Sequence, residues 1–98
     1  MSKFGHLISS SEYVFFSFYS ENNRLALQAE LNNIAEALKD KAKVIKIDIE
    51  KNRELTAALR ITNFPTYVLY KNEEMVWRNS SDLKSDEIMN LIQQYFQE

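Results

Sequence analysis

The stretch that decides the fold of this chain is Tyr13-Val14-Phe15-Phe16-Ser17-Phe18-Tyr19. Apolar side chains occupy both sets of alternating positions in this run, so both faces of a strand formed here have to be covered. A strand that is half exposed to water alternates apolar and polar residues instead. The run therefore predicts a strand in the middle of a sheet, with other elements packed on both sides.

The segments that flank this strand have helical periodicity. Residues 3–9 are predicted to form a short helix with an apolar face of Phe4, Leu7 and Ile8. Residues 22–40 are predicted to form a longer helix, for which Ser20 or Asn22 is the expected cap. The longer helix repeats an apolar residue every three or four positions, at Leu27, Leu31, Ile34 and Leu38.

A second strand and a third helix follow. Residues 44–50 alternate isoleucines with charged residues, which predicts a strand nearer the edge of the sheet. Asn52 is expected to cap a short helix that ends before Phe64-Pro65, because a residue preceding proline is disfavoured in the helical region. The apolar face of this helix is expected to consist of Leu55, Ala58 and Leu59.

The remaining segments predict a hairpin and a last helix. Residues 66–70 and 75–78 read as antiparallel strands joined by a turn at 71–74. The turn contains no glycine, and a positive φ at Glu73 would cost roughly 1–2 kcal/mol. Ser85 is the expected cap of the last helix, whose apolar stripe is Ile88, Leu91, Ile92, Tyr95 and Phe96.

The order of these elements is α-β-α-β-α-β-β-α. The helix between the first two strands implies that they are parallel, while the last two strands form an antiparallel pair. We therefore predict an α/β fold with three layers, in which helices cover both faces of a mixed four-stranded sheet. Residues 1–98 show no repeat and no composition boundary, so a single domain is expected.

Composition narrows the range of functions. The 98 residues carry a formal net charge of −2, and no stripe of Lys and Arg suggests a nucleic-acid partner. No apolar run is long enough to span a membrane, and the start does not resemble a secretory signal, so the cytoplasm is the expected location. The sequence has no cysteine and one histidine, His6, without ligand-type neighbours. We therefore expect no metal and no cofactor.

Three segments, at residues 18–26, 44–50 and 59–66, together resemble the thioredoxin family. The strand that leads into the second helix is similar to the family's active-site segment, and residues 44–50 to its next parallel strand. Residues 59–66 resemble the family's Ile/Val-Pro-Thr segment, which implies a cis peptide bond before Pro65. The resemblance covers roughly residues 4–97 and lacks the extra N-terminal strand of many members. The active-site counterpart here is Phe18-Tyr19-Ser20-Glu21-Asn22-Asn23-Arg24-Leu25-Ala26.

The departures from the family concern its chemistry. Residue by residue, the Cys-Gly-Pro-Cys motif falls on Asn23-Arg24-Leu25-Ala26, and the family's buried Asp falls on Ser17. Thiol–disulfide exchange needs a thiolate and a second thiol that resolves the mixed disulfide, and neither Asn23 nor Ala26 supplies one. We expect Ser17 to bond to backbone or water. The sequence therefore predicts a redox-inactive chain that is not an enzyme.

A peptide-binding role is the main functional hypothesis. In the family, the residue before the cis-proline offers its backbone to an extended peptide, and Phe64 occupies that position here. The candidate site consists of Tyr19, Asn23, Arg24, Phe64, Pro65 and Thr66. Arg24 beside a helix N-terminus could also attract an anion or an acidic peptide. The alternative is that Pro65 only shapes its loop and Asn23 only caps a helix.

Other interpretations stay open. Tyr19, Phe64 and Trp77 could form an exposed aromatic patch, although aromatic strand residues are more often core. Asp48 and Glu50 could suggest acid–base chemistry, although a solvated edge is the stronger interpretation. The partner is expected to be a protein or an extended peptide. Alternatively, the chain is an obligate homo-oligomer that packs through an apolar Leu25/Ala26 surface. Homology alone would suggest an oxidoreductase.

Overall fold

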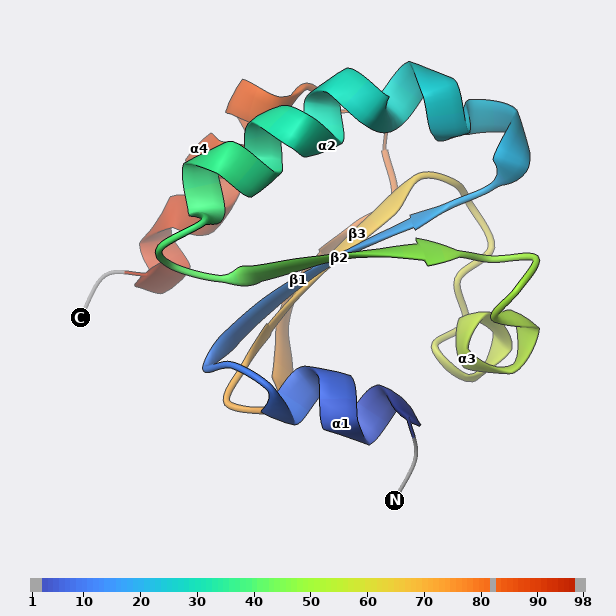
Figure 1. Cartoon of the computed structure of the whole chain (residues 1–98), viewed down its shortest axis with the longest axis horizontal. Helices are drawn as coiled ribbons and strands as arrows, with labels where there is room; N and C mark the ends of the chain where they lie inside the picture. The colour runs from blue at the N-terminus through green and yellow to red at the C-terminus, as the bar shows by residue number, and fades with distance from the viewer. Residues whose placement is uncertain (1–2, 82, 97–98) are drawn as a thin grey trace.

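The chain forms a three-layer α/β structure (Figure 1). A computed structural model describes residues 3–81 and 83–96. One mixed four-stranded sheet has the order β2-β1-β3-β4, with β1 and β2 parallel and the other neighbours antiparallel. The elements are α1 (Lys3–Ser9), β1 (Tyr13–Tyr19), the 3₁₀ turn η1 (Glu21–Asn23), α2 (Arg24–Leu38), β2 (Lys43–Asp48), α3 (Arg53–Ala58), β3 (Thr66–Lys71), β4 (Glu74–Asn79), α4 (Ser85–Ile92) and the 3₁₀ turn η2 (Gln93–Phe96).

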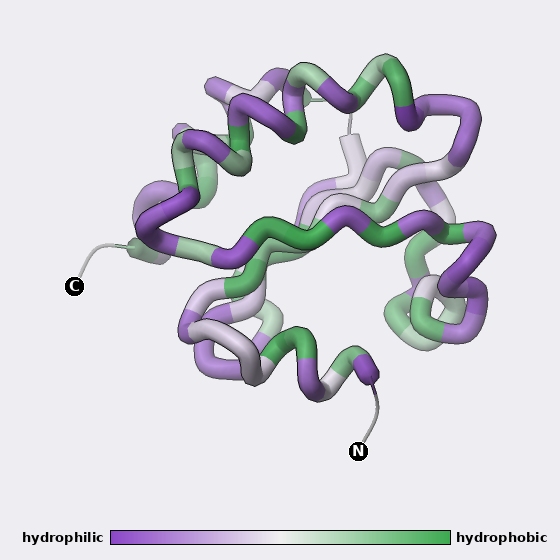
Figure 2. Tube along the Cα trace, in the orientation of Figure 1, coloured by the Kyte–Doolittle hydropathy of each residue, from purple (hydrophilic) through white to green (hydrophobic). Residues whose placement is uncertain are grey.

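The β1 strand lies in the middle of the sheet, as its composition predicts. It pairs with β2 on one side and β3 on the other, and six of its seven residues are buried. Phe15 and Phe16 are both fully buried, and they belong to the two separate cores on opposite faces of the sheet. The β2 strand is at the edge, also as predicted, and Figure 2 shows apolar stretches interrupted by polar residues along it.

The helices α2 and α4 cover one face, which we call the α2/α4 face (Figure 1). The four buried residues of α2 are those of its predicted stripe, Leu27, Leu31, Ile34 and Leu38. Ile88 and Ile92 of α4 are buried as well, but Leu91 is 42% exposed, contrary to the prediction. The contact uses the i, i+4 ridge of Ile88 and Ile92, so Leu91 lies on the flank of this short helix.

The helices α1 and α3 lie on the opposite face, the α1/α3 face, and cover it less completely (Figure 1). No residue of α1 is buried, and Thr56 is the only buried residue of α3. The ring of Phe4 packs 5.2 Å from that of Phe16 and 5.5 Å from that of Tyr70, centroid to centroid. Leu55 and Leu59 pack against this core as predicted, but Ala58 is exposed, because α3 is too short to bury a full stripe.

The starts of two helices differ in part from the predictions. The 3₁₀ turn η1 precedes α2, so the expected cap Ser20 stands at the N-cap of η1, and Asn23, not Asn22, stands at that of α2. Ser85 is the first residue of α4, preceded by Lys84 at the N-cap, and the Ser85 N–H donates to the Glu30 carboxylate of α2. Asn52 does stand at the N-cap of α3, but its side chain donates to the Asp48 carbonyl (2.9 Å) and accepts no helix N–H.

The hairpin turn contains two left-handed residues. Asn72 has φ = 52° and Glu73 has φ = 69°, the signs that a two-residue type I′ turn requires. Glu73 therefore has the positive φ for which the cost was given above, and the twist of the hairpin favours it. None of the helices that the described residues form is long and apolar enough to cross a bilayer.

Candidate functional site

The carboxyl end of β1 brings the predicted site residues together. Tyr19 ends β1 and is the Cα partner of Asp48, which ends the parallel strand β2. On the other side, Phe18 is the partner of Thr66, so the loop that precedes β3 emerges beside Tyr19. The peptide bond between Phe64 and Pro65 in this loop is cis. Consequently η1, the end of β2 and the cis-proline loop meet at one end of the sheet.

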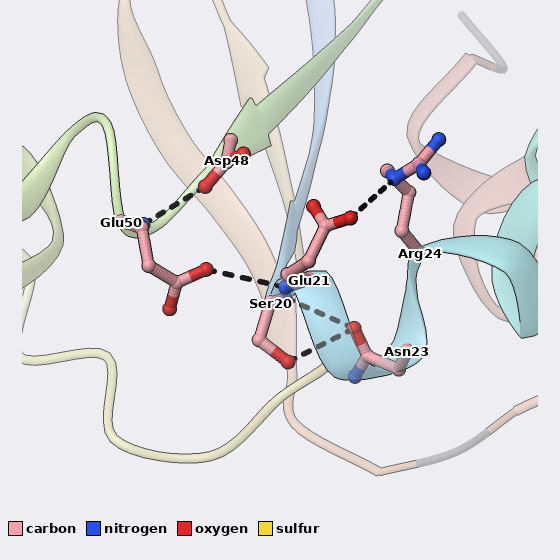
Figure 3. Close-up of polar contacts among 6 residues, drawn as sticks. All are labelled: Ser20, Glu21, Asn23, Arg24, Asp48 and Glu50. Carbon is pink, nitrogen blue, oxygen red and sulfur yellow. Dashed lines mark hydrogen bonds and ion pairs between the residues drawn. The ribbon is translucent and has the colours of Figure 1, made fainter.

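The turn at η1 is held by the chain's own acceptors (Figure 3). Asn23 Oδ1 accepts the Ser20 N–H (2.9 Å) and lies 3.3 Å from Ser20 Oγ. Glu50 Oε1 accepts the Glu21 N–H (3.2 Å), and the Glu50 N–H donates to Asp48 Oδ1 (2.9 Å). These contacts occupy the N–H groups of Ser20 and Glu21, where the helical segment begins. Asp48 and Glu50 therefore act here as structural acceptors, not as an acid–base pair.

Neither former cysteine position presents a reactive group. Asn23 is half-buried with its amide oxygen folded back toward Ser20, and Ala26 is exposed on α2. Arg24 Nε lies 3.2 Å from Glu21 Oε1, and both side chains are more than half exposed. Such a surface ion pair contributes little stability. It also places a carboxylate beside the cation that was a candidate for binding anions (Figure 3).

Ser17 occupies the position of the family's buried Asp and is fully buried. Its Cα partners are Lys46 of β2 and Tyr67 of β3. Within the described residues its hydroxyl reaches no hydrogen-bond partner, so the expected bond to the backbone is not made. The reason is that the sheet ladders use the neighbouring backbone groups, while the side chains around Ser17 on the α2/α4 face are mostly apolar.

The remaining candidate residues lie in the cis-proline loop, where some groups are buried and others are available to a ligand. Pro65 and Thr66 are buried, and Thr66 Oγ1 donates to the Asn63 carbonyl (2.5 Å) and lies 3.0 Å from Ser80 Oγ. These two side chains hold the loop and offer no contact surface. Phe64 is half-buried against the α1/α3 core. In the described part of the chain, its N–H and C=O have no hydrogen-bond partner.

A hollow beside this loop was not predicted from the sequence. Its volume is about 650 Å³, and it lies between α3, the end of β2 and the segment that precedes Phe64. Its apolar lining comes from Ile49, Ala57 and Ile61, and its polar lining comes from Glu50, Arg53, Thr56, Arg60 and Thr62. Ile49 and Ile61 were recognisable in the sequence, because each closes or follows an apolar segment. That both line one hollow depends on the fold.

The predicted aromatic patch does not form. Tyr19 and Trp77 pack against the α2/α4 core, whereas Phe64 packs against the core on the opposite face. All three side chains are half-buried. Tyr19 and Trp77 project from strands to the α2/α4 face, whereas Phe64 lies in the loop before β3 and packs on the other side of the sheet.

No metal centre is evident in residues 3–81 and 83–96, where no three His, Asp or Glu side chains cluster with metal-ligand geometry. His6 is exposed on α1. The chemistry that this end of the sheet offers is therefore backbone hydrogen bonding at Phe64 beside a partly apolar hollow.

Comparison with known proteins identifies the family. A model described as Thioredoxin matches residues 2–94. The chain belongs to the thioredoxin family. It is 35% identical over 63 residues to thioredoxin Y1, a chloroplastic protein of Arabidopsis thaliana, in a match that covers 64% of this chain and 37% of the relative. The matched region thus spans less than half of that relative's length.

Solved thioredoxin structures have the same fold. A mutant thioredoxin from Halobacterium salinarum NRC-1 superimposes with a TM-score of 0.82 at 25% identity, covering 100% of this chain and 87% of that one. The oxidised thioredoxin of Plasmodium falciparum gives a TM-score of 0.81 at 25% identity, with 99% and 93% covered. The thioredoxin fold predicted from the sequence is confirmed, although this chain has no cysteine.

Proposed function

We propose that this chain is a redox-inactive member of the thioredoxin family that binds an extended peptide segment beside Phe64 and Pro65. The observation that carries the proposal is the unpartnered backbone of Phe64 in the described structure, next to a hollow of about 650 Å³. An extended peptide adds to such a backbone by main-chain hydrogen bonds, and a neighbouring pocket selects its side chain.

The redox part of the proposal rests on sulfur chemistry. The family's reaction needs an attacking thiolate and a resolving thiol. The chain has no cysteine at any position, and Asn23 and Ala26 stand where the motif would be. We expect no reduction of insulin disulfides with any thiol donor present, measured by the turbidity of the released chains. Turnover at the rate of a thioredoxin control would contradict this.

The lining of the hollow indicates the kind of peptide. Ile49, Ala57 and Ile61 offer an apolar surface, while Arg53 and Arg60 stand at its border. We therefore expect a peptide with a bulky apolar side chain, which enters the hollow while the peptide backbone pairs with Phe64. Burial of one Leu or Phe side chain in this way contributes about 1.5–3 kcal/mol.

The test is an amide NMR titration with extended model peptides that differ only in one central residue, Leu or Ser. We expect shifts at residues 49–50 and 61–66 with the Leu peptide and weaker binding of the Ser peptide. The variant Ala57→Phe fills the hollow and should weaken binding about tenfold. Ala37→Phe places the same ring on the exposed side of α2 and is the matched control.

Two results would contradict the proposal. One is the absence of shifts around Phe64 with every peptide. The other is equal affinity of the parent chain and Ala57→Phe, because binding would then not use the hollow.

A homo-oligomer remains the second candidate, since one observation favours it. Leu25 is 72% exposed at the start of α2, beside the exposed Ala26. An apolar patch of this kind is found at interfaces between copies. Sedimentation equilibrium tests it: dissociation of an oligomer by Leu25→Glu would support it, and a monomer at high micromolar concentration would remove it.

A further inference from the structure

A wider groove lies on the α1/α3 face, outside the proposed peptide site. Its volume is about 1040 Å³, and α3 separates it from the smaller hollow beside Phe64. Figure 1 shows α1 and α3 standing apart on this face, near the two ends of β2. The floor of the groove is apolar and consists of Phe4, Leu7, Ile45, Ile47, Leu55 and Leu59.

Positive charge surrounds this apolar floor. Three exposed cations line the groove with their side chains, Lys3, Lys51 and Arg53, against two exposed carboxylates, Glu50 and Glu54. Lys46 also borders the groove, but its side chain projects to the α2/α4 face. The groove thus carries a net charge of +1 in a chain whose formal charge is −2.

None of these three cations has a carboxylate within ion-pair distance in the described structure. Elsewhere on the surface, Arg24 and Lys39 each pair with a glutamate one turn away on the same helical segment. Of the two groove carboxylates, Glu50 already accepts the Glu21 N–H. The positive charge of the groove is therefore available to a partner of opposite sign.

The form of the groove favours a helix over a strand as its occupant. An added strand would pair with the free edge of β2, but Lys43 and Lys46 lie on that edge strand, and edge lysines oppose strand addition. The floor presents apolar side chains, which match the apolar stripe of an amphipathic helix. A third helix between α1 and α3 would complete the layer on this face, as α2 and α4 do on the other.

We propose that the groove between α1 and α3 is a docking site for an acidic amphipathic helix of a partner protein. The apolar stripe of that helix packs on the side chains of the floor, and Asp or Glu residues on its flanks face Lys3, Lys51 and Arg53. The proposal goes beyond the peptide site at Phe64 and does not depend on it.

The test uses two synthetic peptides of about 18 residues, long enough for a helix to form. Both carry Leu at i, i+3, i+4 and i+7, and their flanking positions are Glu in one peptide and Lys in the other. We expect the Glu peptide to shift amides of α1, β2 and α3 and to bind about tenfold more tightly at low salt. High salt should reduce this preference, because it screens exposed charges.

Two charge-reversal variants test whether the Glu peptide binds in the groove between α1 and α3. Lys3→Glu/Lys51→Glu reverses two charges of the groove and should abolish the preference for the Glu peptide. Lys39→Glu/Lys41→Glu reverses two exposed charges outside the groove and should preserve it. Circular dichroism establishes that both variants are folded. If Lys3→Glu/Lys51→Glu fails to fold, the proposal is tested on the parent chain instead, by whether high salt reduces its preference for the Glu peptide.

Three outcomes would overturn the proposal. Equal affinity for both peptides would show nonspecific hydrophobic binding, and shifts confined to residues 61–66 would place the binding at the other site. Self-association of the chain through α1 and α3, seen by sedimentation, would mean that a second copy covers the groove.

Discussion

The two faces of the sheet differ in how completely helices cover them, although the sheet buries apolar side chains on both. Phe15 and Phe16 are adjacent in β1, point to opposite faces and are both fully buried. On the α2/α4 face, helices of 15 and 8 residues bury four and two residues. On the α1/α3 face, helices of 7 and 6 residues bury none and one.

This difference in cover assigns stability mainly to the α2/α4 face and binding mainly to the α1/α3 face. The hollow at the border of the α2/α4 face, lined in part by Tyr19 and Lys46, has a volume of about 160 Å³. The two larger hollows, of about 650 and 1040 Å³, both adjoin α3. The face with long helices forms most of the core, and the face with short helices keeps apolar surface within reach of partners.

Core substitutions on the two faces should give the largest contrast. Ile34→Ala in α2 creates a cavity at a fully buried position and should lower the free energy of unfolding by about 2–5 kcal/mol. Phe4→Ala in α1 removes a larger side chain that is only half-buried, and should cost roughly 1–2 kcal/mol. Urea unfolding followed by circular dichroism measures both. An equal cost would break the comparison between the faces.

A smaller effect on the free energy of unfolding is expected at Arg78, whose hydrogen bonds hold the chain at the end of α3. Arg78 of β4 donates to the carbonyls of Leu59 (2.6 Å) and Arg60 (2.9 Å), just after α3, and Arg60 has φ = 56°. Arg78→Met keeps the aliphatic stem and loses both bonds, so we expect a cost of about 1 kcal/mol.

Hydrogen exchange sharpens this prediction. Amides of α3 should exchange faster in Arg78→Met, while those of α2 stay protected. Arg24→Met is the control, since that guanidinium contacts only the exposed Glu21, and its cost should stay within a few tenths of a kcal/mol. Uniformly faster exchange in both helices would mean that Arg78 supports the whole fold and not α3 alone.

The smallest effect concerns Tyr70 on the α1/α3 face. Burial raises the pKa of its phenol above the ordinary value of 10.0, although Arg78 opposes the rise. The unfolded chain therefore ionises first, so this contribution to stability is complete below pH 10 and is lost as pH rises toward the folded pKa. Tyr70→Phe should flatten the alkaline loss of stability in urea unfolding, and Tyr19→Phe is the control. An unchanged pH profile would show that Tyr70 is not responsible.

Much of the fold was predictable because its signals are local. The apolar run at 13–19 identified the central strand, and the alternation at 44–50 identified a strand at the edge. Helix starts were less predictable, because distant groups supply their partners. The Ser85 N–H, for example, meets Glu30 from α2. Similarly, Asn52 stands at the expected N-cap, but its side chain bonds to Asp48.

The candidate site was predictable only in part. The sequence pointed to Asn23 and Phe64, and the structure brings their segments to the same end of the sheet. It did not indicate that Asn23 would fold back onto Ser20, or that Pro65 and Thr66 would be buried. The hollow was also missed, since its lining comes from three separate segments and its volume depends on how they pack.

Residue periodicity and chemistry are local properties, and they were enough to establish the order of elements, the central position of β1 and the lack of any thiol. The packing of the chain established which apolar residues stay partly exposed, which backbone groups of the described residues lack partners and which cations remain unpaired. These features depend on the lengths and placement of α1 and α3 relative to the sheet, and burial is a property of the whole packed chain.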